Sequence, residues 1–201
     1  QRSDVMERPQ GTTRSEARLT AVLQRERLSV LALATVSYTL DAAWITAFIP
    51  SGGATWRLAA SYALLAWGAC AGFALLFRRG WNLRLRDPHL TVPQVAVGYL
   101  LQLGFLAVAP QIGPLFLGTM IIVAAFSALT MTARQFAWTW VLVSLAMGGV
   151  LWLVGGAVRF PVATPWEQGV AWLVAASILG RVSVVNARVM RLREQVERKA
   201  V

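Results

Sequence analysis

The feature that most constrains this chain is the grouping of its apolar residues into blocks of about 20, the length of a helix that crosses a bilayer. The 201 residues are 57% hydrophobic and include 9 Trp and 16 Gly, which is too apolar for an ordinary soluble domain. We therefore predict an all-α membrane protein with six transmembrane helices, since a helix satisfies its own backbone hydrogen bonds in lipid. The predicted spans are residues 28–49, 58–77, 95–112, 114–131, 136–154 and 166–185.

The positive charges fall on one side of this arrangement. A net charge of +10 is compatible with nucleic-acid binding, but the distribution of the charges argues against that partner. If the six spans cross the membrane in alternating directions, all of the 19 Lys and Arg except Arg57 and Arg159 lie in segments assigned to the same side. By the positive-inside rule, both termini are predicted to be cytoplasmic. Basic segments beside a membrane also attract anionic lipid, so we expect membrane lipids as partners.

Residues 1–27 are polar and are predicted to form a cytoplasmic segment. From Ser15 the pattern becomes helical, with Leu19, Val22 and Leu23 on one face, as in an interfacial helix. The first span, residues 28–49, is too long for the apolar region of a signal peptide, so we expect it to be retained.

The last predicted helix, residues 166–201, is apolar to about residue 185 and highly charged beyond it. Apolar residues continue across this change with the alternating three- and four-residue spacing of a two-stranded coiled coil. No Gly or Pro interrupts the run from Arg181 to Val201, so the helix is predicted to leave the membrane without a break. These apolar residues, which we call the seam, are Val182, Val185, Val189, Leu192 and Val196.

The seam predicts a homodimer joined by a cytoplasmic stalk that begins at residues 186–201 and transmits a conformational state. The alternative is an amphipathic tail that lies on the lipid head groups. Gln1 is not a start Met, and the heptads stop in mid-phase. We therefore expect the sequence, with its membrane part at 28–185, to be one module of a longer protein.

Asp41, in the outer half of the first predicted span, is the only acidic residue away from the end of a span; Glu167 lies in the first turn of the sixth. A carboxylate at the position of Asp41 is costly unless it faces protein or water. Tyr38, Trp44 and Ile45 share its helix face, and Tyr62, Gln102 and the outer-loop Arg159 are possible partners. Asp41 either contributes to an outward-facing pocket for a ligand or a proton, or it makes a buried structural hydrogen bond or salt bridge.

Tryptophans add to this candidate pocket, although packing explains them equally well. The candidate ligand-binding residues are Tyr38, Asp41, Trp44, Tyr62, Gln102, Trp152 and Arg159. The sequence contains no glycine-rich phosphate loop, metal-ligand spacing or nucleophile with a base, so we predict no catalytic residue and no metal site. The single Cys70 excludes an intrachain disulfide.

The inner loop at 78–94 has a dense pattern of polar residues. Asp87 followed by Pro88 fits a helix cap with proline in the first turn. Thr91 and Gln94 have the spacing of a capping box at the start of the third span. Both features predict a structural role for this loop.

This loop resembles the N-terminal membrane module of bacterial diguanylate cyclases of the GGDEF class, in which six spans precede a helical stalk and the cyclase domain. The family loop reads much like N-L-R-F-x-D-P-S-L-T-x-x-Q, and His89 stands here in place of a small residue. The resemblance covers nearly the whole chain, but only the loop is specific. Among the matching positions we assign a structural role to Asn82, Arg84, Arg86, Asp87, Pro88, Thr91 and Gln94.

The resemblance implies a multi-pass protein of the bacterial inner membrane that dimerises through its stalks and so aligns two cyclase domains to make cyclic di-GMP. GTP and magnesium would bind to that domain, which is absent from these 201 residues, so no cofactor is expected in this chain. We therefore expect a sensor of an unknown small apolar or amphipathic ligand.

Two other functions remain open on the sequence. The same sensor could control a histidine kinase. A small transporter is disfavoured, because the spans contain few polar residues near the midplane and no matching pair of broken helices.

Overall fold

The computed structural model describes residues 10–85, 87, 89–159 and 164–200, with side chains described between residues 21 and 182 except at residue 129. Every regular element in these ranges is a helix. Three short 3₁₀ turns, η1, η2 and η3, cover Trp81–Arg84, Pro110–Ile112 and Gly155–Ala157. The six α-helices are α1 (Gln10–Ala47), α2 (Trp56–Arg78), α3 (Thr91–Val108), α4 (Gly113–Thr130), α5 (Ala133–Val154) and α6 (Pro165–Ala200).

Five stretches of the described chain are helical, long enough and apolar enough to cross a membrane. This supports a membrane protein, as the blocks of apolar residues predicted. α6 is not among the five, and its apolar half carries Glu167, Gln168 and Arg181. The sixth span therefore stays a prediction. The five stretches are Ala21–Ala47, Trp56–Arg78, Thr91–Val108, Pro110–Ala128 and Ala133–Ala157.

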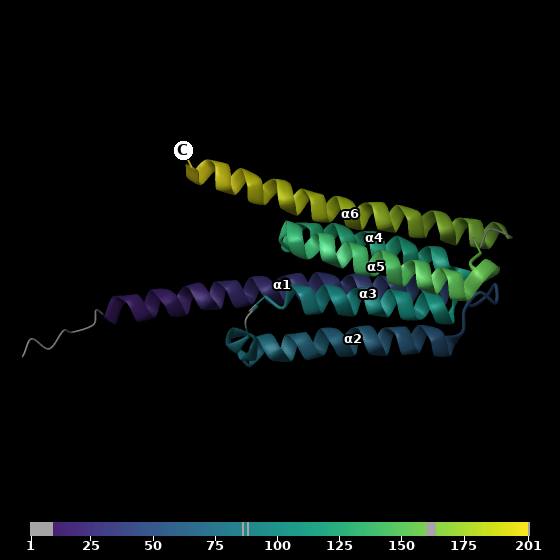
Figure 1. Cartoon of the computed structure of the whole chain (residues 1–201), viewed down its shortest axis with the longest axis horizontal. Coiled ribbons are helices and arrows are strands. Elements are labelled where there is room, and N and C mark those ends of the chain that lie inside the picture. Colours follow the sequence, from purple (N-terminus) through teal and green to yellow (C-terminus); the bar gives the residue numbers. More distant parts are fainter. Residues whose placement is uncertain (1–9, 86, 88, 160–163, 201) are drawn as a thin grey trace, which may run out of the picture.

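The helices lie side by side with their long axes roughly parallel (Figure 1). α1 contacts α2, α4 and α6, while α3 contacts α2, α4 and α5. The first half of α1 and the last half of α6 project from the same end of the bundle (Figure 1). The helix expected from Ser15 is part of α1, which runs from Gln10 to Ala47 without a break.

The core lies among the first four long helices. Its centre is an aromatic cluster in which the Tyr62 ring centroid is 5.0 Å from that of Phe105 and 6.2 Å from that of Phe116. α5 has no buried residue, and the buried residues in the described part of α6 are Glu167, Val170 and Val174. Consequently α5 and α6 present most of their apolar side chains outward, as helices that face lipid do.

Two glycines allow close contacts between helices. A Cβ on Gly98 of α3 would lie 3.0 Å from the Tyr38 hydroxyl oxygen, and one on Gly118 of α4 would overlap Ile178 of α6. Both sites therefore let a large side chain from another helix approach the backbone.

The inner loop packs against the projecting part of α1. Asn82 is fully buried and accepts a hydrogen bond from Gln24 Nε2 at 3.0 Å, and the same nitrogen donates to the Phe77 carbonyl at 3.2 Å. Arg27 Nε donates to His89 Nδ1 at 3.4 Å. The loop thus connects the middle of α1 with the end of α2 and the start of α3, which supports the structural role predicted for Asn82.

The start of α3 differs from the prediction, because the N-cap residue is Leu90 and not Asp87. The Asp87 carboxylate still accepts hydrogen bonds from the backbone N–H groups of His89 and Thr91, both at 3.0 Å. The capping box predicted for Thr91 and Gln94 is not formed, since Gln94 Nε2 donates to the His89 carbonyl instead. In a capping box the N–H group of Thr91 would donate to the Gln94 side chain, but here it donates to Asp87. Arg84 is exposed, and Arg86 and Pro88 lie outside the described residues.

Candidate functional site

A buried polar network surrounds Asp41, whose side chain is 1% exposed. Arg181 Nη1 lies 2.6 Å from its Oδ1, and Thr119 Oγ1 donates to the same oxygen at 3.3 Å. The Tyr62 hydroxyl donates to Oδ2 at 3.1 Å and accepts a hydrogen bond from Gln102 Nε2 at 2.8 Å. Five helices, α1, α2, α3, α4 and α6, therefore each contribute one side chain to the network.

The network forms because a lone charge is disfavoured inside a membrane. Asp and Arg each cost about 2.5–3.5 kcal/mol at the centre of a membrane helix when unpaired. Pairing Asp41 with Arg181 neutralises both charges, and the hydroxyls of Tyr62 and Thr119 supply further hydrogen bonds to the carboxylate. The ion pair thus ties α6 to α1 through a carboxylate that is almost fully buried.

The guanidinium of Arg181 is only partly satisfied. Its Nη1 faces Asp41 and also the Ser37 hydroxyl at 2.9 Å and the Ser37 carbonyl at 3.3 Å. Its Nε and Nη2 atoms are buried and have no hydrogen-bond partner among the described residues. An unpaired buried donor costs about 1–3 kcal/mol, so this position of α6 is not the best that Arg181 could have.

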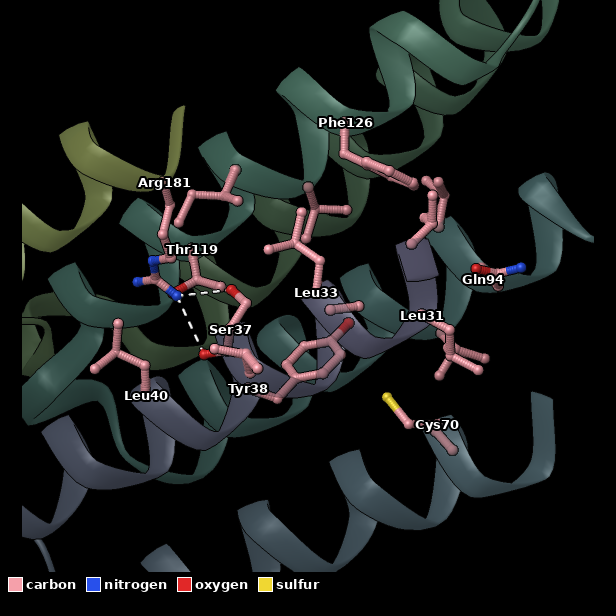
Figure 2. A pocket seen from close by; sticks show the side chains of 18 of the residues that line it. Leu31, Leu33, Ser37, Tyr38, Leu40, Cys70, Gln94, Thr119, Phe126 and Arg181 are labelled. Carbon is pink, nitrogen blue, oxygen red and sulfur yellow. Dashed lines mark hydrogen bonds between the residues drawn. The ribbon is translucent and has the colours of Figure 1, made fainter. Parts of the chain in front are cut away.

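A cavity of about 500 Å³ adjoins the ion pair and extends along α1 (Figure 2). Its walls are nearly all hydrocarbon, and its size lies within the range of roughly 300–1,000 Å³ that is usual for small-molecule sites. α1 contributes nine residues between Val30 and Trp44, and α2, α3 and α4 add most of the others. α6 contributes Ser177, Gly180 and Arg181.

Several predicted site residues meet here. The expected contact between Asp41 and Tyr62 is confirmed. Gln102 is fully buried and reaches Asp41 only through the Tyr62 hydroxyl. Tyr38 and Trp44 line the cavity, and Trp44 Nε1 donates to the Ser177 hydroxyl at 3.4 Å.

Two predicted residues lie elsewhere. Trp152 is 83% exposed on α5. Arg159, considered as a partner of Asp41, is exposed beyond η3, and Arg181 is the cation that pairs with the carboxylate. Arg181 lies on α6, which packs beside α1, and this packing brings its side chain to Asp41.

The sequence interpretation missed Arg181, Thr119 and Ser37. Arg181 was counted among the cytoplasmic charges because it comes shortly before the charged end of the chain. Its position within the apolar residues 170–185 was the available signal, since a cation there needs an anion and Asp41 is the only one away from the end of a span. Thr119 and Ser37 gave no signal, because hydroxyls are common in membrane helices.

The backbone of α6 is one helix to Ala200, which is the continuity that the seam requires. Val182 is partly buried. The side chains of Val185, Val189, Leu192 and Val196 lie outside the described residues, so the coiled coil stays a prediction.

No family model, curated protein or solved structure matches the chain.

The ion pair leads to a stability prediction. Asp41→Asn and Arg181→Met each leave one buried charge without its partner, so each should lower the free energy of unfolding by about 3–5 kcal/mol. The double variant removes both charges and should lose much less than the sum of the two. Unfolding in detergent micelles, followed as a double-mutant cycle, measures the difference.

Arg159→Met is the matched control, because this arginine is exposed; a change within about 0.5 kcal/mol is expected. Additive losses in the cycle would show that Asp41 and Arg181 are not coupled.

Proposed function

We propose that this chain is a membrane sensor module that binds a small apolar or amphipathic molecule and controls a cytoplasmic output domain through α6. The observation that carries the proposal is the double role of Arg181. This residue lines the cavity and also makes the ion pair that ties α6 to α1. A molecule that enters the cavity and moves the guanidinium therefore changes how α6 is held.

The partly satisfied guanidinium supports a second position of α6. A ligand shifts a conformational equilibrium only if it binds one state better than the other. The unpaired Nε and Nη2 atoms disfavour the present position, so a modest ligand contribution is sufficient to favour another. The described part of α6 has few buried residues, which keeps the energy difference between two positions small.

In the membrane arrangement that we propose, six helices span the bilayer and both termini are cytoplasmic. The distribution of Lys and Arg supports this orientation. The projection of α1 and α6 from one end of the bundle also agrees with it (Figure 1). Glu167 and Arg181 are buried or partly buried and are therefore compatible with a sixth span.

We further propose that the output domain is a diguanylate cyclase, on the resemblance of residues 81–94 to the loop of that family. In this proposal two stalks pair along the seam, and a change in the packing or register of α6 realigns two cyclase domains. GTP and magnesium would then be bound by the cyclase domain.

Orientation is tested by labelling single cysteines in a Cys70→Ala background with an impermeant thiol reagent on intact cells. Gly156→Cys, in the outer turn, should be labelled, and Arg84→Cys, in the inner loop, should be labelled only after lysis. Both positions are exposed, so a difference between them reports the side of the membrane rather than burial. The opposite pattern would overturn the proposed orientation.

Transmission from the cavity is tested by filling it in the protein that carries the output domain. Ala34 lines the cavity, so Ala34→Phe should occupy it and change cyclic di-GMP production by about 5-fold or more at equal protein level. Ala32→Phe places the same ring on an exposed position of the same helix and should leave production unchanged. Equal production in both variants would refute control by the cavity.

The stalk is tested by insertions after Leu192. Four residues create a stutter, which rotates the part of the stalk beyond the insertion, whereas seven residues restore the heptad phase. The level of cyclic di-GMP production should therefore change when four residues are inserted and stay the same when seven are inserted. A tail on the lipid surface would give output that does not depend on insertion phase.

A further inference from the structure

The cavity is long and narrow. Its lining follows α1 from Val30 to Trp44, which is about 21 Å at 1.5 Å per residue. A volume of about 500 Å³ spread over that length gives a mean cross-section on the order of 25 Å². This shape suits an extended hydrocarbon chain better than a compact ring system.

The cavity is open toward the surface of the bundle that faces lipid. Leu33 and Val36 of α1 and Gly180 of α6 line it and are also exposed. A molecule dissolved in the hydrocarbon of the bilayer can therefore enter sideways, between α1 and α6, without crossing water.

The Nε and Nη2 atoms of Arg181 have no partner in the described part of the chain but are themselves buried, and one further polar group in the wall is left over. The hydroxyls of Ser37, Thr119 and Ser177 and the amide of Gln94 all make hydrogen bonds within the protein. The Tyr38 hydroxyl makes none with a described residue. Its ring lies among the lining side chains, between Arg181 at one end and Gln94 at the other (Figure 2).

The room for this hydroxyl is provided by Gly98, since a Cβ there would lie 3.0 Å from the oxygen. An O–H group without a partner in the wall of an apolar cavity favours a ligand with a hydrogen-bond acceptor.

Charge balance indicates which kind of acceptor it is. Arg181, the cation of the wall, is already neutralised by Asp41 at 2.6 Å. An anionic ligand would leave one negative charge uncompensated in an apolar site, which is strongly disfavoured. A neutral carbonyl accepts the same hydrogen bond without that penalty.

We propose that the cavity binds a neutral lipid-like molecule, a single hydrocarbon chain with an ester, ketone or quinone carbonyl that accepts a hydrogen bond from the Tyr38 hydroxyl. The chain lies along α1 and passes the guanidinium of Arg181. This assignment names the ligand class of the sensor site and so rests on the function proposed above.

The test uses the purified module in lipid nanodiscs and a long-chain methyl ester that carries a diazirine near the end of its chain. Irradiation should label cavity residues of α1, and Ala34→Phe should abolish this labelling while Ala32→Phe retains it. Unlabelled methyl palmitate should compete about 10-fold better than hexadecane, because only the ester accepts the hydrogen bond.

Tyr38→Phe removes the hydroxyl and keeps the ring, so it should abolish the preference for ester over alkane and leave alkane competition unchanged. A preference that survives Tyr38→Phe would refute the assignment of this residue. Stronger competition by palmitate than by its methyl ester would refute the neutral head group. Equal labelling of Ala34→Phe and the unsubstituted module would refute binding in the cavity.

These outcomes are separate from those of the proposed function. Ester preference without any effect of Ala34→Phe on cyclic di-GMP would leave the ligand class standing and refute the sensor. An effect of Ala34→Phe on cyclic di-GMP production without ester preference would leave the sensor standing and refute the ligand class.

Discussion

The ion pair between Asp41 and Arg181 is the interaction on which the arrangement of this molecule depends. Each charge alone would be disfavoured in an apolar interior, and together they are neutral. Because the two residues lie on α1 and α6, their pairing decides how the last helix packs against the first. Tyr62 and Thr119 complete the carboxylate's hydrogen bonds from α2 and α4, so the network also sets the relative heights of these helices.

The packing around this pair is uneven, and the unevenness has a consequence for the proposed sensor function. The first four long helices enclose the aromatic cluster of Tyr62, Phe105 and Phe116 and form a firm core. α6 is held by a few buried side chains, by the close approach of Ile178 to Gly118, and by Arg181. A helix held at few points, one of them only partly satisfied, can adopt a second position without disturbing the core. The cavity lies beside the ion pair, so an occupant acts where α6 is easiest to move.

The same geometry accounts for the composition of the cavity wall. Nearly every polar group that borders it is already used by the protein, which keeps the interior apolar and excludes water. The exceptions are the buried Nε and Nη2 atoms of Arg181 and the Tyr38 hydroxyl, for which Gly98 makes room. A single unsatisfied hydroxyl in a long apolar space favours a chain with one acceptor over an ion or a polar metabolite.

The sequence by itself determined the local features of this protein. Blocks of apolar residues determined a helical membrane protein, because lipid leaves the backbone no other way to satisfy its hydrogen bonds. The isolation of Asp41 in an apolar helix identified the centre of the site, and Tyr62 could be named as a partner. The continuity of α6 also came from the sequence, since no Gly or Pro interrupts residues 181–201.

Only the tertiary structure decided which residues from separate helices meet. Hydropathy gives the length of a helix but neither its rotation nor its depth, so the sequence suggested Arg159 as a partner for Asp41 and missed Arg181. The packing of α6 beside α1 selected Arg181. At α3, the sequence contained two possible caps, and the path of the inner loop brought Asp87 rather than Thr91 to the free N–H groups. The cavity belongs to no single segment, because five helices form its wall, and no local pattern could have predicted it.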